Sequence, residues 1–136
     1  TIMSISSWTA QYYKRSAKAA ATSPLDAVKH SLKKWKGLRA KNRREHDLVV
    51  KSQRLYDGAG DYLSIDGSTC ALCVLMKREN SFIPDCDNCP ITKATGKACC
   101  GGDSDDPYNT WTFSGNPKPM IKVLKATRNY LLEQTK

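Results

Sequence analysis

Residues 23–38 read SPLDAVKHSLKKWKGL and give the clearest helix signal in the chain. Ser23 is a favourable N-cap residue, and Pro24 suits the first helical position. Apolar residues then recur at steps of three and four, which is the spacing of one helix face. These residues are Leu25, Val28, Leu32, Trp35 and Leu38. The pattern predicts a helix over 24–44 with this stripe in the core.

Three further helices are expected outside this segment. Residues 7–21 are rich in alanine and contain apolar residues at helical spacing. The members of that face are Trp8, Tyr12 and Ala19. We expect a second helix over 46–56 and an amphipathic helix over 119–134. The helices are predicted to pack around Leu32, Trp35, Leu38 and Leu124.

The middle of the chain has a different composition. Residues 61–115 are rich in Gly, Asp, Asn, Ser, Pro and Cys, which favours turns and short strands over long helices. We therefore expect a basic helical region at 1–60, a cysteine-rich metal-binding module at 61–115 and a C-terminal amphipathic helix at 116–136. The predicted fold is mainly α, a small helical domain with an irregular zinc-knuckle insert.

All six cysteines lie within this middle region. Cys70 and Cys73 form one C-x2-C pair, Cys86 and Cys89 form a second, and the adjacent Cys99-Cys100 follows. A C-x2-C turn brings two thiolates within reach of one tetrahedral ion, and two such turns complete a closed structural shell. The pattern predicts one Zn²⁺ site. Six cysteines compete for four positions, so Cys99 or Cys100 could replace a member of the second pair.

Other uses of these cysteines remain open. Cys89 is followed by Pro90, a step found in iron–sulfur proteins, although the compact C-x2-C-x2-C run is missing. An iron–sulfur cluster is therefore the alternative to zinc. A secreted disulfide framework would distribute its cysteines along the chain. The cysteines are clustered, and the chain has no N-x-[ST] glycosylation acceptor, so we expect the protein in the reducing environment of the cytoplasm.

The order of the motifs resembles a set of small uncharacterised bacteriophage proteins. The motifs in this chain are Cys70-Ala71-Leu72-Cys73, Cys86-Asp87-Asn88-Cys89-Pro90-Ile91, Thr95-Gly96, a cysteine at 99 or 100, and Pro107-Tyr108. The resemblance covers roughly residues 24–110. It implies a viral origin and action in the cytoplasm of a host cell. The long basic stretch and the second cysteine of the 99–100 pair depart from the pattern.

Positive charge is concentrated in the first 60 residues. They hold 13 of the 22 Lys and Arg residues but only four of the 13 acidic residues. Such asymmetry suggests contact with an anionic partner. The residues expected to contact phosphates are Lys29, Lys33, Lys34, Lys36, Arg39, Lys41, Arg43 and Arg44.

The sequence contains no convincing catalytic site, so we expect a protein that is not an enzyme. His30 and His46 are the only histidines, and both are expected on exposed helix surfaces. No P-loop, Rossmann or EF-hand signature occurs, and no small-molecule substrate is suggested. No segment has the ~20 apolar residues of a membrane helix. The first prediction is nucleic-acid binding through the basic helices. The alternative is an interaction factor that binds an acidic host protein of the transcription, replication or defence machinery.

Overall fold

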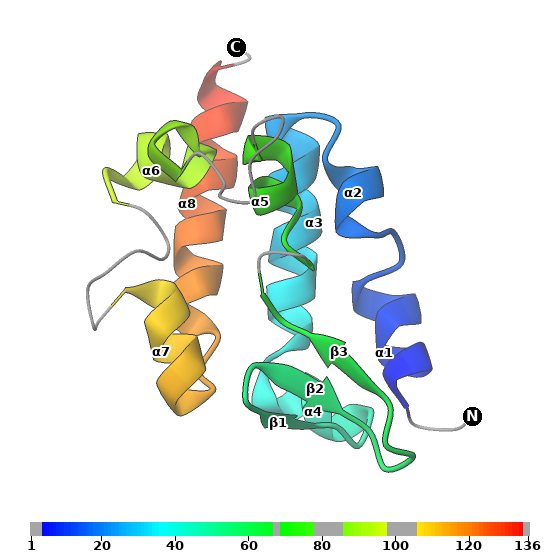
Figure 1. The fold of residues 1–136 in the computed structure, drawn as a ribbon. Coiled ribbons are helices and arrows are strands. Elements are labelled where there is room, and N and C mark those ends of the chain that lie inside the picture. The colour runs from blue at the N-terminus through cyan, green and yellow to red at the C-terminus, as the bar shows by residue number, and fades with distance from the viewer. Residues whose placement is uncertain (1–3, 67–68, 78–85, 98–105, 135–136) are drawn as a thin grey trace.

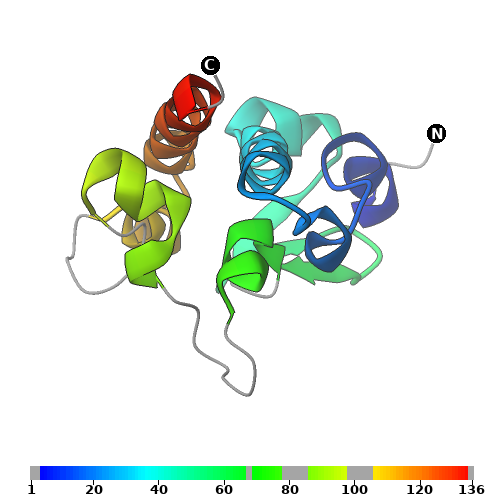
Figure 2. The same ribbon diagram turned by 90° about the horizontal axis from the view of Figure 1, so that it is seen from above.

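Two long antiparallel helices, α3 (Pro24–Gly37) and α8 (Lys118–Gln134), form the centre of the molecule. The computed structural model describes residues 4–66, 69–77, 86–97 and 106–134. Figure 2 shows α3 between α8 on one side and α1 (Ile5–Tyr12) and α2 (Ala17–Ala20) on the other. The fold is mainly α, as predicted, with a small sheet at one end of α3 (Figure 1).

The start of α3 confirms the prediction from its sequence. The hydroxyl of Ser23 accepts a hydrogen bond from the backbone N–H of Asp26, 3.2 Å away, and Pro24 opens the first turn. The helix ends earlier than expected, at Gly37. After Leu38 and an extended Arg39, the chain resumes as the short helix α4 (Ala40–Glu45).

A close contact explains the position of Gly37. The indole N–H of Trp8 donates to the Gly37 carbonyl at 2.9 Å, and the ring of Tyr12 lies against the glycine. A β-carbon at residue 37 would collide with that ring. Glycine is therefore required for α1 to approach the end of α3.

The expected helix over 7–21 is divided into α1 and α2. Tyr13 ends α1, and its side-chain hydroxyl accepts a hydrogen bond from the N–H of Ala17. Ser16 then caps α2 by accepting from the N–H of Ala19. Ala19 is exposed instead of sharing the buried face of Trp8, because the interruption changes the helical phase.

The helix predicted over 46–56 is wrong. The segment forms strands β1 (Val49–Lys51) and β2 (Arg54–Tyr56), and β3 (Tyr62–Ser64) completes an antiparallel sheet in the order β1-β2-β3. Between β1 and β2, Ser52 and Gln53 both have positive φ, which the tight I′ turn of a two-residue hairpin requires. The boundary predicted at residue 60 falls within the second hairpin.

Short helices occupy much of the described middle region. They are α5 (Ala71–Met76), the 3₁₀ helix η2 (Cys86–Asn88), α6 (Pro90–Thr95) and α7 (Pro107–Ser114). The composition correctly excluded long helices in this region, but short helices are more common there than the expected strands. α5 packs against α2 and α3, whereas α6 and α7 pack against α8.

The predicted core is confirmed. Leu32, Trp35, Leu38 and Leu124 are all buried. Trp111 packs on Trp35, and the Tyr108 hydroxyl lies 2.6 Å from Gln53 Oε1 and 3.1 Å from the Ile65 carbonyl oxygen. Among the described helices, none combines the length and hydropathy needed to cross a bilayer.

Candidate functional sites: the cysteine pairs and a basic surface

Each C-x2-C pair lies at the start of a short helix. Cys70 is the N-cap of α5, and Cys73 follows within the helix. Cys86 opens η2, and Cys89 is the N-cap of α6. None of these four described cysteines is in a disulfide. Because η2 packs against α5, the two pairs belong to neighbouring elements.

The thiols differ in their electrostatic environment. A hydrogen bond from Cys73 is the main reason that the pKa of Cys70 lies well below its usual range, and the positive charge of Lys34 acts in the same direction. Burial raises the pKa of Cys89 to about 11, and the negative charges of Cys70 and Cys86 contribute to this rise. Thiolate formation is therefore favoured at Cys70 and opposed at Cys89.

The geometry shows two cysteine pairs but no assembled metal shell. Within the described residues, no three or more His, Cys, Asp or Glu side chains form a group that could hold a metal ion. Cys99 and Cys100, the other predicted ligands, lie outside the described residues. The donor set still suits a soft or borderline cation, because thiolates are strong ligands for zinc.

Lys34 is not on the exposed basic face where the sequence analysis placed it. Its side chain is only 1% exposed, and its ammonium donates to the Thr69 carbonyl at 2.9 Å. The same ammonium lies 5.4 Å from the ring centroid of Trp35. The expectation that Lys34 contacts phosphates is therefore wrong, since α5 and the segment before it cover this side of α3.

Small residues on α3 gave a signal for this burial. Ser31 lies one turn and Ala27 two turns before Lys34 on the same side of the helix, and both are buried. The Ser31 hydroxyl is 3.8 Å from the sulfur of Cys70. A stripe of small side chains lets another element approach closely, and α5 does so here.

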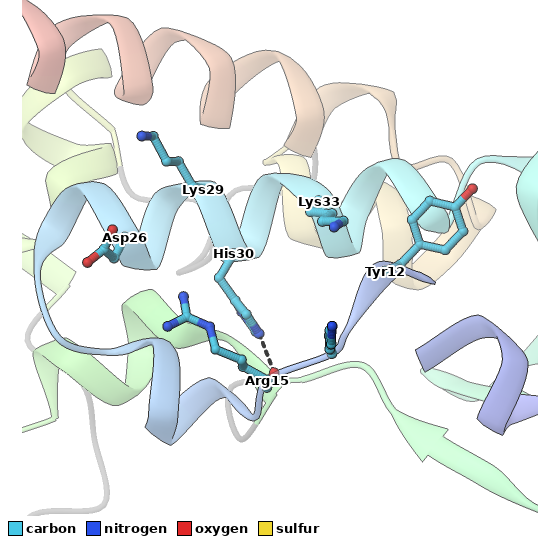
Figure 3. Close-up of a pocket in the computed structure, with 7 residues that line it drawn as sticks. Tyr12, Arg15, Asp26, Lys29, His30 and Lys33 are labelled. Atoms are coloured by element: carbon cyan, nitrogen blue, oxygen red, sulfur yellow. Dashed lines mark hydrogen bonds between the residues drawn. The ribbon is translucent and has the colours of Figure 1, made fainter. Parts of the chain in front are cut away.

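The other predicted lysines of α3 do share a solvent-facing side. Lys29, Lys33 and Lys36 follow a spacing of four and then three residues, which places them on one helix face. Lys29 and Lys33 are exposed, and Lys36 is half-buried. Lys29 and Lys33 also line an open pocket with Lys14 and Arg15 (Figure 3).

The C-terminal helix extends this positive surface. Burial is the main cause of the lowered pKa of Lys36, and repulsion from Lys125, Arg128 and Arg39 lowers it further. The sequence analysis missed Lys125 and Arg128, because only the packing of α8 against α3 brings them to this side. We use the term basic surface for the following eight residues. They are Lys14, Arg15, Lys29, Lys33, Lys36, Arg39, Lys125 and Arg128.

The predicted cations of α4 occupy a different part of the molecule. Lys41 and Arg44 are exposed on this short helix after α3. Arg43 is half-buried, and its Nε donates to the Leu38 carbonyl at 2.9 Å. Burial is the main cause of its lowered pKa, and the charge of Arg44 contributes. Arg43 therefore has a structural role at the junction of α3 and α4.

Both histidines are less exposed than expected. His46 is buried, with Nδ1 2.8 Å from the Ser7 hydroxyl and Nε2 2.9 Å from Gln11 Oε1. His30 is half-buried and lies 2.6 Å through Nε2 from the Arg15 carbonyl oxygen. Both side chains connect α1, or the segment after it, to later parts of the chain.

Comparison with known proteins gives no relative from which a role could be transferred. No protein-family model matches the chain, and no curated protein or solved structure matches it either. The cysteine pairs and the basic surface are therefore the features from which function is inferred.

Proposed function

We propose that the chain binds nucleic acid through the basic surface. The observation that carries the proposal is the gathering of positive side chains from three parts of the chain. Lys14 and Arg15 precede α2, Lys29 and Lys33 lie on α3, and Lys125 lies on α8. Holding like charges together costs free energy, and a bound polyanion relieves this repulsion.

The direction of α3 suits contact with a phosphate backbone. Lys29 and Lys36 are separated by about 10 Å along the helix axis, given a rise of 1.5 Å per residue. Lys14 and Arg15 adjoin this row on one side, and Lys125 and Arg128 adjoin it on the other. Long lysine and arginine side chains neutralise phosphates without reading the bases. We therefore expect binding with little sequence preference.

We also propose that one structural Zn²⁺ joins the cysteine pairs. Cys70, Cys73, Cys86 and Cys89 are the favoured ligands, and Cys99 or Cys100 remain the alternatives for the second pair. Packing of η2 against α5 supports the proposal, as does the mutual electrostatic influence of Cys70, Cys86 and Cys89. The ion would fasten α5 to α6, and thereby the α3 side of the molecule to the α8 side.

Elemental analysis of protein purified without added metal tests the zinc site. The expected result is one zinc per chain and no visible colour. A Cys70→Ser, Cys73→Ser variant should lose the zinc. If the protein instead contains iron and absorbs visible light at ~400 nm, the site holds an iron–sulfur cluster and not zinc. A fully reduced protein without metal would contradict both versions of the site.

Fluorescence anisotropy with labelled DNA and RNA oligonucleotides tests the nucleic-acid proposal. We expect log Kd to rise linearly with log salt concentration, with a slope set by the number of phosphate contacts. Lys29→Glu with Lys33→Glu should weaken binding by at least tenfold. The matched control is Lys51→Glu with Lys93→Glu. It reverses the charge of two exposed lysines that lie outside the basic surface. Equal weakening by both double variants, or no binding at low salt, would contradict the proposal.

A second candidate is binding to a protein partner, favoured by a different surface. The Phe113 side chain is 80% exposed and lies beside a pocket of about 310 Å³ that Arg43 and Lys51 also line. Aromatic and arginine side chains are enriched at protein interfaces. A pull-down with the intact chain tests this candidate. It is supported if the captured protein no longer binds the Phe113→Ala variant but still binds the variant with Lys29→Glu and Lys33→Glu.

A further inference from the structure

The basic surface contains a concave site, which is a feature that simple contact with a phosphate backbone does not require. An open pocket of about 590 Å³ lies between α3 and the segment that joins α1 to α2. Its lining residues are Tyr12, Lys14, Arg15, Asp26, Lys29, His30 and Lys33 (Figure 3). This volume is within the range of sites that enclose small ligands.

The charge of the pocket selects an anion. Its lining carries four cationic side chains and one carboxylate, that of Asp26. Asp26 already accepts a hydrogen bond from the Thr22 hydroxyl at 3.1 Å. Among the described residues, none of the four cations forms an ion pair with a carboxylate. Their charges are therefore available to a ligand.

His30 fixes the chain segment that supplies two of these cations. A carbonyl oxygen can only accept, so Nε2 of His30 is the donor in the 2.6 Å hydrogen bond to Arg15. The ring also packs on Tyr13, with centroids 4.9 Å apart. Burial is the main cause of the lowered pKa of His30. His30 is thus a positioning residue that holds the Arg15 backbone against α3.

We infer that this pocket binds the terminal phosphate of a nucleic-acid strand together with its end nucleotide. A terminal phosphate monoester carries about −1.5 to −2 charges at neutral pH, whereas an internal phosphodiester carries one. Cations that line one concave site from two segments suit the higher charge of the monoester. Tyr12, at the end of the pocket, supplies an aromatic ring of the kind on which bases stack. The inference rests on the proposed function and names the ligand at part of the same surface.

Paired oligonucleotides that differ only at their ends test this inference. The full chain is titrated with a short single strand bearing a 5′-phosphate, a 3′-phosphate or only hydroxyl ends, each labelled internally. We expect one phosphorylated strand to bind at least tenfold more tightly than the hydroxyl strand. Arg15→Ala with Lys33→Ala should remove this preference. Lys125→Ala with Arg128→Ala should weaken all three strands by the same factor and keep the preference.

Two outcomes separate this inference from the wider proposal. Equal binding of the three strands would overturn the terminal-phosphate site and leave nucleic-acid binding intact, whereas absence of binding by every strand would overturn both. A nucleoside monophosphate that competes as well as the phosphorylated strand would identify a site for free nucleotides and overturn the assignment to a strand end.

The positioning role of His30 has its own readout. His30→Gln keeps a side-chain N–H donor and should retain the preference for the phosphorylated end, whereas His30→Leu should lose it while still binding the hydroxyl strand. Equal preference in both variants would remove His30 from the site.

Discussion

The indole rings of Trp35 and Trp111 meet edge to face, with centroids 5.2 Å apart and planes at 86°. Both side chains are almost fully buried. This contact joins α3 to α7, which in turn packs on α8. Trp35 therefore connects α3, which carries Lys29, Lys33 and Lys36 of the basic surface, to the C-terminal part of the fold.

Truncation at this contact should strongly destabilise the protein. Trp111→Ala removes a large buried ring and is expected to lower the free energy of unfolding by about 3–5 kcal/mol. Urea denaturation followed by circular dichroism measures the change. Phe113→Ala on the same helix is the control, since its ring is exposed and should change the value by less than about 0.5 kcal/mol. Similar losses in the two variants would contradict the packing described here.

Lys33 and Lys34 are neighbours in sequence with opposite expected effects. Lys34→Ala removes a buried side chain and its hydrogen bond to Thr69, so we expect a loss of about 2–4 kcal/mol in unfolding free energy. Lys33→Ala should leave stability within about 0.5 kcal/mol but weaken nucleic-acid binding. Under conditions where both variants are folded, Lys34→Ala should bind like the unchanged protein. If Lys33→Ala destabilised the protein and Lys34→Ala weakened binding, the solvent-facing side of α3 would be wrongly assigned.

The contact between Tyr12 and Gly37 can be tested with a double-mutant cycle. Gly37→Ala introduces a β-carbon into the Tyr12 ring and is expected to destabilise the protein by about 1–3 kcal/mol. In a Tyr12→Gly background the Tyr12 ring and its β-carbon, which are the nearest atoms that the new β-carbon would meet, are both absent. Alanine at residue 37 then favours the helix by up to about 1 kcal/mol over glycine. The sign of the effect should therefore change between the two backgrounds. Equal costs in both backgrounds would place the strain elsewhere.

Asp57 should make folding sensitive to acid. Its carboxylate accepts hydrogen bonds from the backbone N–H groups of Ile5, Ala59 and Asp61. The bond from Ile5 is the main cause of a pKa below the ordinary 3.8, and the others add to it. Because the folded-state pKa is the lower one, the stabilisation is fully present above about pH 5 and is lost as pH falls through the folded pKa.

Thermal melts between pH 2 and 7 measure this contribution. Asp57→Asn should lower Tm at pH 7 and converge with the unchanged protein at the acidic end. Asp61→Asn is the matched control, because the Asp61 side chain is exposed and only its backbone contacts Asp57. A constant difference in Tm across the whole range would mean that the charge of Asp57 does not contribute.

Capping residues and apolar spacing within a segment predicted the two long helices. Ser23 and Pro24 marked the start of α3, and the apolar spacing before residue 134 marked α8. The hairpin after α4 was missed because Ser52 and Gln53 adopt positive φ without the Asn-Gly or Gly residues that usually indicate such a turn. Hydrogen bonds from distant residues hold Gln53, whose side chain accepts from the Tyr108 hydroxyl and whose carbonyl accepts from the N–H of Ile65.

In the candidate sites, too, local spacing predicted some features, whereas others depend on tertiary packing. The exposed positions of Lys29 and Lys33 followed from helical spacing. The contribution of Lys125 and Arg128 depends on which helix packs beside α3, and sequence spacing within one helix carries no such information. The signal for the burial of Lys34 lies in the small residues Ala27 and Ser31 on the same side of α3, and not in its charge.

The pairing of α3 with α8 also has a consequence for synthesis of the chain. The apolar side of α3, including Leu32 and Trp35, leaves the ribosome about 80 residues before the helix that covers it, an interval of several seconds at ~5–20 residues per second. During this time the nascent helix exposes apolar side chains that are buried in the folded protein, next to a row of lysines. Final folding must therefore wait until α8 has been made.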